Sequence, residues 1–196
     1  MRLKIGIDFD NTLACYDDVF YRIACEKNLI PADFSNCKTH IRDYLRSQKQ
    51  EEAWTTLQGT VYGPGMGLAQ PFSGVEKFFT ACFSLDITPV IISHRTRHPY
   101  LGPRYDLHEA ARQWLNSYPF FKDCEAFFET TLQAKLERIQ KEHCDVFIDD
   151  LPELLQEPSF PSTVKRVLFD PKSLYPCNPT WLILTSWHQM PSILKS

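Results

Sequence analysis

The sequence lacks the features that mark several classes of protein. Its longest apolar runs, at residues 90–92 and 181–184, are far too short to span a bilayer, so no membrane segment is expected. Lysine and arginine number 21 against 24 acidic residues, and no long run of one sign occurs. A nucleic-acid polymer or an anionic membrane surface is therefore not an expected partner. No internal repeat, low-complexity tract or linker rich in glycine and serine divides the chain.

Cysteine is present but gives no disulfide framework. The seven cysteines are an odd number, and no two of them form a C-x-x-C pair. Their spacing therefore indicates neither structural disulfides nor a zinc site. The first four residues lead directly into a strand pattern, without the apolar region of a signal peptide. We expect reduced, mostly buried thiols and a cytoplasmic location.

Length and composition fit a globular fold. A chain of 196 residues suits one compact domain, with room for a small inserted subdomain. Hydrophobic residues make up 43% and charged residues 23%, and the 14 phenylalanines can fill a core. A chain of this size buries roughly 70% of its unfolded surface. Nothing in the composition indicates an oligomeric state.

Strand-like and helix-like segments alternate along most of the chain. Short apolar segments predict buried strands, and apolar residues at helical spacing predict helices. Ser73 followed by Glu76 has the pattern of a capping box at the start of another helix. Strands are expected at 3–9, 87–93, 125–128, 144–150 and 164–170, and helices at 17–28, 38–58 (one or two helices), 105–117, 130–143, from 151 onwards and over the tail at 179–190.

This alternation predicts the fold class. Strands separated by helices favour an α/β fold, a Rossmann-like doubly wound parallel sheet with helices on both faces. Residues 15–72 contain no expected strand and are interpreted as a helical insertion. We therefore expect an α/β core formed by 1–14 and 73–196, with 15–72 as a small inserted unit.

The most informative segment follows the first expected strand as D-x-D-x-T, formed by Asp8, Asp10 and Thr12. Strand alternation places the two carboxylates on the same side. Ligands bind at the carboxyl ends of strands in parallel sheets, and two carboxylates there repel each other unless a cation neutralises them. Oxygen ligands alone favour Mg²⁺ over zinc. The alternative is a turn rich in Asp and Asn, whose side chains satisfy backbone donors.

Two further polar residues fall at positions suited to an anionic ligand. Ser93 ends the apolar run at 90–92, where a hydroxyl can bind a phosphate oxygen, although a serine there is commonly a cap or turn residue. Lys135 lies early in an expected helix and could neutralise a phosphoryl group. Helix lysines are more often solvated, and Lys141 is a rival candidate.

Asp149 and Asp150 end the strand expected at 144–150. They could bind the same cation as the first acidic pair. They could instead cap the following helix, in which Pro152 suits the first turn. The two functions are compatible, because a helix that begins at a strand end offers both.

The order of these elements along the chain resembles that of the four motifs of the haloacid dehalogenase (HAD) superfamily. Motifs I to IV would be the segment 8–12, Ser93, Lys135, and the pair Asp149 and Asp150. The resemblance covers residues 3 to about 170, and the insertion at 15–72 occupies the position of the family's cap. Motif I and the acidic pair also look similar to the deoxyribonucleotidase-like branch. Asn11 stands where glycine is frequent, and the acidic pair replaces the G-D-x-x-x-D form of motif IV.

The resemblance implies a mechanism and a cofactor. Asp8 would be the nucleophile that forms an aspartyl-phosphate, and Asp10 the acid and then the base. Mg²⁺ would be held by the Asp8 carboxylate, the main-chain carbonyl of Asp10 and one residue of the pair at 149–150, for which alignment favours Asp150 over Asp149. Ser93 and Lys135 would bind the phosphoryl oxygens.

The expected substrate is a small phosphate ester such as a nucleotide or a sugar phosphate. Asp10, the second acid of D-x-D, favours a phosphatase over a dehalogenase. An alkoxide leaving group needs a proton to leave, and a halide does not. The basic loop with His94, Arg95 and Arg97, together with Asn11, provides candidate substrate-binding residues, although such arginines often only pair with surface acids. A phosphotransferase with the same chemistry and a non-catalytic module that binds a phosphorylated ligand remain alternatives.

Overall fold

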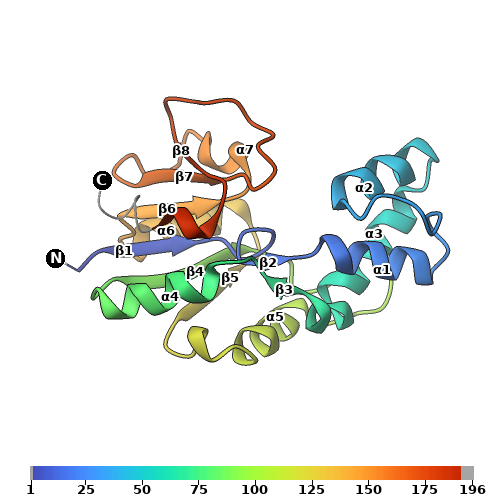
Figure 1. Cartoon of the computed structure of the whole chain (residues 1–196), viewed down its shortest axis with the longest axis horizontal. Coiled ribbons are helices and arrows are strands. Elements are labelled where there is room, and N and C mark those ends of the chain that lie inside the picture. The colour runs from blue at the N-terminus through green and yellow to red at the C-terminus, as the bar shows by residue number, and fades with distance from the viewer. Residues whose placement is uncertain (1, 191–196) are drawn as a thin grey trace. The chain divides into compact units, whose positions relative to one another are not determined.

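Six parallel strands form the sheet at the centre of the fold, in a computed structural model that describes residues 2–190. The strand order is β5-β4-β1-β6-β7-β8, and every neighbouring pair is parallel. The sheet and its flanking helices are shown in Figure 1. The expected α/β fold with a parallel sheet is thereby confirmed. The strands are β1 (Lys4–Ile7), β4 (Thr88–His94), β5 (Glu125–Glu129), β6 (Val146–Asp149), β7 (Lys165–Phe169) and β8 (Leu182–Leu184).

The chain reverses its direction of travel across the sheet at β1. From β1 it moves outward through β4 to β5, then returns to place β6 on the other side of β1 and continues to β7 and β8. This arrangement creates a switch point between β1 and β6 at the carboxyl ends of the two strands. The side chains that follow Ile7 and Ile148 are therefore placed where a ligand binds in folds of this kind.

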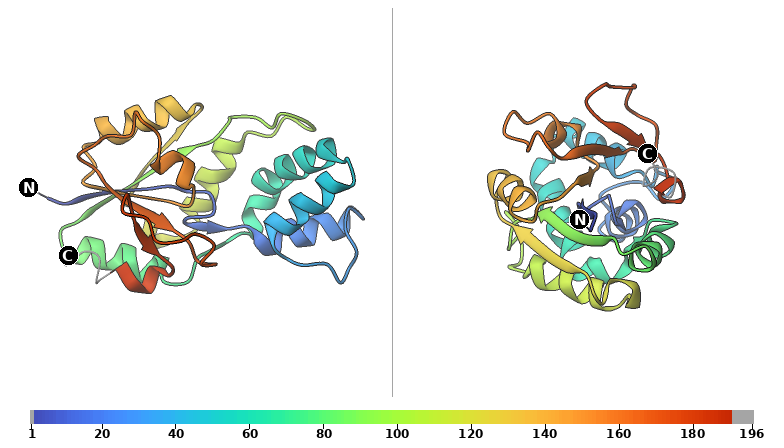
Figure 2. Two further views of the ribbon diagram at one scale, coloured as in Figure 1. Left: turned by 90° about the horizontal axis from the view of Figure 1, so that it is seen from above. Right: turned by 90° about the vertical axis from the view of Figure 1, so that its left-hand side faces the viewer.

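Helices cover both faces of the sheet. One face packs against α6 (Leu132–Lys141) and α7 (Pro152–Leu155), and the other against α4 (Val75–Ser84), as Figure 2 shows. Apolar side chains of α6 and α7 form a core with alternate residues of the strands. The short 3-10 helices η2 (Pro119–Phe121) and η3 (Trp187–Gln189) both lie against α4.

The chain divides into two compact units. The first comprises residues 1–14, 71–94 and 119–196 and holds the sheet, and the second comprises 15–70 and 95–118. The second unit is helical and includes α5, whereas the boundaries drawn from the sequence place the helix at 105–117 in the core. Its elements are α1 (Asp17–Glu26), α2 (Lys38–Ser47), α3 (Glu51–Tyr62), η1 (Pro64–Leu68) and α5 (Leu107–Asn116).

The loop after β4 explains why α5 belongs to the second unit. The guanidinium of Arg95 donates to the carbonyls of Leu107 and Tyr62, which joins the start of α5 to the end of α3. The indole of Trp114 donates to the carbonyl of Ala69 at 2.8 Å. These buried contacts attach 95–118 to the helices of 15–70. The insertion was also expected to lack strands, yet its two ends pair as the short strands β2 (Ala14–Cys15) and β3 (Gln70–Pro71).

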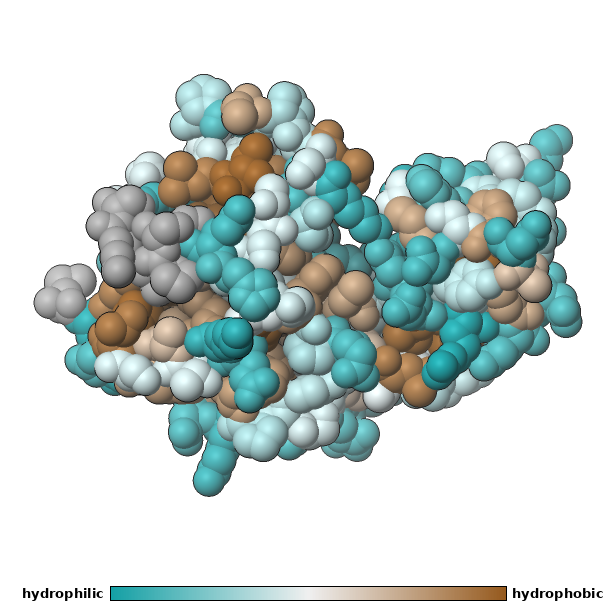
Figure 3. Space-filling model, viewed as in Figure 1, coloured by the Kyte–Doolittle hydropathy of each residue, from teal (hydrophilic) through white to brown (hydrophobic). Residues whose placement is uncertain are grey.

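The tail at 179–190 is not the helix expected from its apolar content. Residues 182–184 form β8, which pairs in parallel with β7, and η3 follows. The apolar run there forms a short edge strand in which Leu184 is buried and Leu182 exposed, and a helix would have left the β7 edge unpaired. Apolar side chains gather on the surface over β7, β8 and the loop between them (Figure 3), where Leu174, Tyr175 and Leu182 are exposed.

The capping box expected at Ser73 and Glu76 does not form. Helix α4 begins after Gly74, which has a φ of 94°, and no side chain caps it. Ser73 Oγ lies 3.1 Å from Nε2 of His188. Only glycine fits well at position 74, because a Cβ there would meet the backbone nitrogen of His188 and Cβ of Trp187 at 3.0 Å.

Across the described residues 2–190, no helix combines the length and the apolar content that crossing a bilayer requires. All seven cysteines are free thiols, but fewer are buried than expected: Cys82 and Cys144 are buried, four are half-buried, and Cys177 is exposed.

Candidate active site

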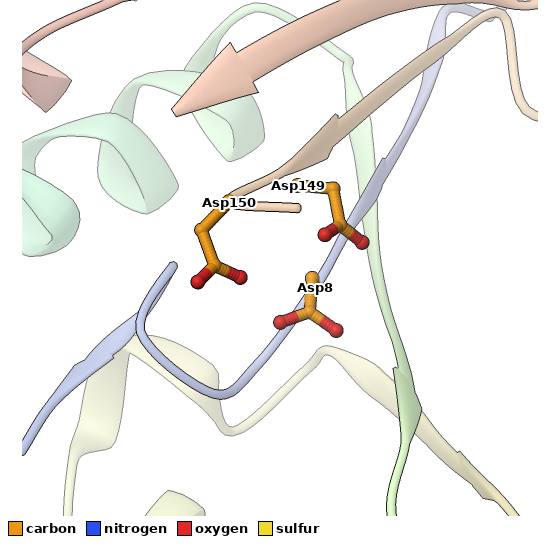
Figure 4. Close-up of side chains that lie close together, drawn as sticks. All are labelled: Asp8, Asp149 and Asp150. Atoms are coloured by element: carbon orange, nitrogen blue, oxygen red, sulfur yellow. The ribbon is translucent and has the colours of Figure 1, made fainter. Parts of the chain in front are cut away.

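Three carboxylates meet at the switch point. Asp8 directly follows β1, Asp149 is the last residue of β6, and Asp150 comes next. The backbone N–H of Asp8 donates to the carbonyl of Ile148 at 2.8 Å, which holds the end of β1 against β6. One ligand atom from each carboxylate lies within 4.8 Å of the others, and Figure 4 shows the three side chains converging. Asp8 and Asp149 are buried and Asp150 is half-buried.

A buried lysine joins two of these acids. Lys135 Nζ lies 2.6 Å from Asp8 Oδ1 and 2.6 Å from Asp149 Oδ2, and the side chain is only 2% exposed. Thr131 places the lysine by capping α6, since its hydroxyl accepts from the N–H of Ala134 at 3.1 Å. The rival Lys141 is exposed at the last residue of the helix. Of the two lysines, Lys135 is therefore the one at the site.

The electrostatics of the site favour a further cation. Burial is the largest influence on Asp8; together with the charges of Asp149 and Asp10 it outweighs Lys135 and raises the pKa of Asp8 to about 7. Burial opposes the charge of Lys135, but the adjacent carboxylates of Asp149 and Asp8 outweigh it and raise the pKa of this lysine. One ammonium therefore stabilises the acidic cluster only in part, and a divalent ion would complete the neutralisation.

The two neighbouring acids of β6 have different surroundings. Asp149 accepts from Lys135 through Oδ2 and from the N–H of Leu151 through Oδ1 at 2.9 Å. Asp150 Oδ1 lies 3.5 Å from the hydroxyl of Thr12. Neither acid is the N-cap residue of α7; that residue is Leu151, whose side chain makes no capping hydrogen bond. Asp149 is thus engaged in holding Lys135 and the loop, which favours Asp150 as the direct metal ligand.

The segment after Asp8 is a tight turn. The N–H groups of Leu13 and Ala14 both donate to the carbonyl of Phe9, at 3.0 and 3.1 Å. Asn11 has a φ of 60°, a left-handed conformation that asparagine tolerates better than most residues. Asp10 is half-buried in this turn, and its charge acts on Asp8, although its carboxylate is not among the three that converge. The turn rich in Asp and Asn is thus present together with the acidic cluster.

Ser93 is the residue of β4 that best fits a phosphate oxygen. It is 1% exposed, and its hydroxyl has no hydrogen-bond partner within the described part of the chain. A buried polar atom without a partner is costly and suggests a ligand contact. His94 follows Ser93 and is largely exposed. The partial burial of its imidazole and the nearby charge of Lys135 hold the pKa of His94 below the ordinary value. A neutral imidazole is therefore expected near pH 7.

The other two basic residues proposed for substrate binding belong to the second unit. Arg95 is buried, and its hydrogen bonds to Leu107 and Tyr62 give it a structural role there. Arg97 is exposed and pairs with Asp106 at 3.0 Å, so its contact is the surface ion pair that was the alternative interpretation.

The donor set fits Mg²⁺. The residues present offer carboxylate oxygens close enough to share one ion, and the orphaned hydroxyl of Ser93 lies on a strand adjacent to β1. Mg²⁺ prefers oxygen ligands and is commonly bound by one or two carboxylates together with water and a substrate phosphate. No thiolate or imidazole belongs to the cluster, among the residues that the structure describes.

Sequence reasoning missed two contacts of Thr12 at this site. The indole Nε1 of Trp187 donates to the main-chain carbonyl of Thr12 at 3.0 Å, across 175 residues of chain. The tail was expected to be a helix, so no pattern placed Trp187 near the turn. Thr12 itself was visible in the D-x-D-x-T pattern, but its contact with Asp150 was not expected.

Comparison with solved structures identifies the fold. A haloacid dehalogenase-like family hydrolase from Streptococcus pneumoniae aligns with a TM-score of 0.64 at 12% identity, covering 98% of both chains. A predicted phosphatase from Clostridium acetobutylicum has a TM-score of 0.64 at 12% identity over the whole of both chains. A magnesium-bound HAD hydrolase from Bacillus subtilis has a TM-score of 0.57 at 15% identity, covering 100% of this chain and 99% of the other.

These similarities define the class of protein by its fold. The chain has the fold of the HAD-superfamily hydrolases, as the four motifs predicted. No protein-family model matches the sequence, and no curated protein matches it significantly. At identities of 12–15% the similarity concerns the fold, and the activity is argued from the site.

Proposed function

We propose that the protein is a Mg²⁺-dependent phosphomonoesterase that acts on a small phosphorylated metabolite through an aspartyl-phosphate intermediate. The observation that carries this proposal is the contact of Lys135 Nζ with Asp8 Oδ1 at the switch point, with Asp150 close by. A carboxylate beside a fixed ammonium and a cation site suits attack on an anionic phosphate, because the positive charges oppose the repulsion between the two anions.

Asp8 is the proposed nucleophile. Its carboxylate oxygen attacks phosphorus, and the bond between phosphorus and the ester oxygen breaks as the acyl-phosphate bond forms. Asp10 donates a proton to the departing alkoxide and later removes one from the water that attacks the same phosphorus. This second step releases inorganic phosphate and restores the Asp8 carboxylate. The ammonium of Lys135 and the hydroxyl of Ser93 bind the phosphoryl oxygens, where transition-state charge is spread.

The carboxylates of Asp8 and Asp150 would hold the metal, with the main-chain carbonyl of Asp10. When bound, Mg²⁺ supplies charge neutralisation between the nucleophile and the phosphate. Asp149 keeps Lys135 in place, since both of its oxygens are already engaged. The HAD hydrolase from Bacillus subtilis that contains magnesium supports this choice of ion.

A nucleotide or a sugar phosphate is the proposed substrate class, and the phosphatase-like neighbours support a small phosphate ester. His94 and Asn11 are the predicted substrate-binding residues that lie in the same unit as the acidic cluster. The seven free thiols suit a reducing compartment, which supports the proposed cytoplasmic location.

Hydrolysis of p-nitrophenyl phosphate tests the function. We expect turnover with Mg²⁺, loss of turnover with excess EDTA, and recovery when Mg²⁺ is restored. Asp8→Asn should lower the rate by at least about a thousandfold, because it removes the nucleophile and the covalent route. Asp86→Asn is the matched control, since Asp86 is exposed at the end of α4 and pairs only with Arg2 among the contacts described. Equal rates for the wild type and Asp8→Asn would falsify the proposed nucleophile.

A further inference from the structure

The turn that carries the acidic motif is attached to a segment far along the chain. Trp187 belongs to η3 and is 1% exposed, and its indole Nε1 donates to the carbonyl of Thr12 at 3.0 Å. Thr12 is fully buried, so water does not compete for that carbonyl. The hydrogen bond therefore fixes the orientation of the peptide that follows Thr12.

Thr12 also contacts the candidate metal site through its side chain. The hydroxyl of Thr12 lies 3.5 Å from Oδ1 of Asp150. The carbonyl of the next residue, Leu13, accepts from the N–H of Phe72 at 2.9 Å, so neighbouring peptides of the turn are both held by distant segments. Any movement of the Thr12 peptide would change the approach of its hydroxyl to Asp150.

Trp187 is itself held rigidly. Its ring lies 4.9 Å from the ring of Phe78 and 5.6 Å from that of Phe169, measured between centroids. The backbone of His188 comes so close to Gly74 that a Cβ at position 74 would lie 3.0 Å from the His188 nitrogen. Rigid packing of this kind suits a donor that must keep one geometry.

We infer that Trp187 is a positioning residue for the proposed metal site, acting through Thr12 on Asp150. The inference rests on the proposed function for its metal, and on contacts within the first unit for its geometry. Groups that orient a metal ligand from outside the coordination shell commonly alter metal affinity by tenfold or more. Trp187 would be a group of this kind, and it lies in η3, outside the four motifs.

The variant Trp187→Phe tests the inference because phenylalanine keeps the aromatic packing and removes the N–H donor. We expect the Mg²⁺ dissociation constant, measured by calorimetry well below the melting temperature, to rise about tenfold. The exchange of the amide hydrogens in 10–14, measured by mass spectrometry without metal, should quicken. The KM for p-nitrophenyl phosphate at saturating Mg²⁺ should change less than the metal affinity.

Two other tryptophans supply matched controls. Trp181 is also buried, but its Nε1 has no hydrogen-bond partner within the described residues, so Trp181→Phe removes an indole without removing a bond. Trp114→Phe removes an indole bond to a main-chain carbonyl, that of Ala69, but in the second unit. Both variants should keep wild-type Mg²⁺ affinity and wild-type exchange in 10–14.

A double-mutant cycle shows whether Trp187 acts through Thr12. The substitution Thr12→Val removes the hydroxyl and keeps the shape of the side chain. If the route runs through Thr12, Trp187→Phe should weaken Mg²⁺ binding much less in the Thr12→Val background than in the wild type. Fully additive effects would contradict the route.

The outcomes separate this inference from the proposed function. If the wild-type protein binds no divalent ion, the proposed function fails, and amide exchange alone decides whether Trp187 orders the turn. If the wild type binds Mg²⁺ but Trp187→Phe binds it as tightly as Trp181→Phe does, the positioning role is overturned. Weaker Mg²⁺ binding by Trp187→Phe alone supports it.

Discussion

Lys135 Nζ lies midway between Asp8 and Asp149, 2.6 Å from an oxygen of each. The three side chains come from a strand end, a helix and a second strand end, and all three are buried. A single ammonium thus links the proposed nucleophile to a neighbouring carboxylate that holds the ammonium in place. Removing this charge should affect folding and chemistry together.

Lys135→Met should destabilise the metal-free protein by about 3 kcal/mol, because two buried carboxylates would lose their shared partner. Phosphatase activity should also fall by at least a hundredfold, since the phosphoryl group loses a fixed positive charge. Urea unfolding in EDTA and the p-nitrophenyl phosphate assay measure the two effects. Lys141→Met, at the exposed end of the same helix, should leave both unchanged, and similar losses in the two variants would contradict the role given to Lys135.

The raised pKa of Asp8 predicts how stability depends on pH. Because the folded-state pKa is about 7 and the ordinary value is 3.8, the folded protein holds this proton more tightly than the unfolded chain does. The contribution of Asp8 to stability is therefore largest at low pH and is lost as the pH rises toward about 7. Asp8→Asn should flatten this part of the stability profile measured by urea unfolding in EDTA.

Metal binding should reverse that trend. A proton on Asp8 competes with a cation, so the rise in melting temperature caused by Mg²⁺ should be larger at about pH 8 than at about pH 5.5. Thermal melts with and without Mg²⁺ at the two pH values measure this difference. A stabilisation independent of pH would mean that Asp8 is not a ligand.

Gly6 should tolerate no larger side chain. A Cβ at this position in β1 would lie 2.5 Å from Cδ2 of Phe147 and 2.8 Å from Sγ of Cys144. Gly6→Ala should therefore destabilise the fold by about 1–3 kcal/mol through overpacking. Gly67→Ala is the control, because a Cβ there meets no atom within 4 Å. Chemical unfolding of the two variants provides the comparison, and equal stability would show that the sheet relaxes around Gly6.

Arg95 is expected to support the second unit. Arg95→Lys should lower stability by about 1–3 kcal/mol, because an ammonium cannot donate to the carbonyls of both Leu107 and Tyr62 in the same geometry. Arg97→Lys should have no measurable effect, since Arg97 is exposed. The KM values of both variants then measure whether either arginine also binds substrate.

The strands and the acidic cluster were predictable because the signals are local. Apolar runs such as 90–92 end at polar residues, and parallel topology brings the ends of β1, β4 and β6 to one edge. The order of the motifs indicated Lys135, but its contacts with Asp8 and Asp149 came from the structure. The different surroundings of Asp149 and Asp150 depend on contacts with Lys135, the N–H of Leu151 and the hydroxyl of Thr12, which no sequence pattern displays.

The sequence-based predictions that differ from the structure concern segments whose conformation depends on contacts with distant parts of the chain. The apolar tail became a strand because β7 offered an open edge, which local spacing does not reveal. Ser73 was expected to cap α4, but the N-cap residue is Gly74, whose backbone is in the left-handed conformation. The loop with Arg95 was assigned to the core by its place after β4, whereas its buried hydrogen bonds tie it to α3 and α5.

The hydrogen bond between Trp187 and Thr12 also has a consequence for biosynthesis. Thr12 leaves the ribosome 175 residues ahead of its indole partner. While the residues between them are being made, the turn next to Asp8 lacks that hydrogen bond. This hydrogen bond can fix the turn only after η3 has been synthesised.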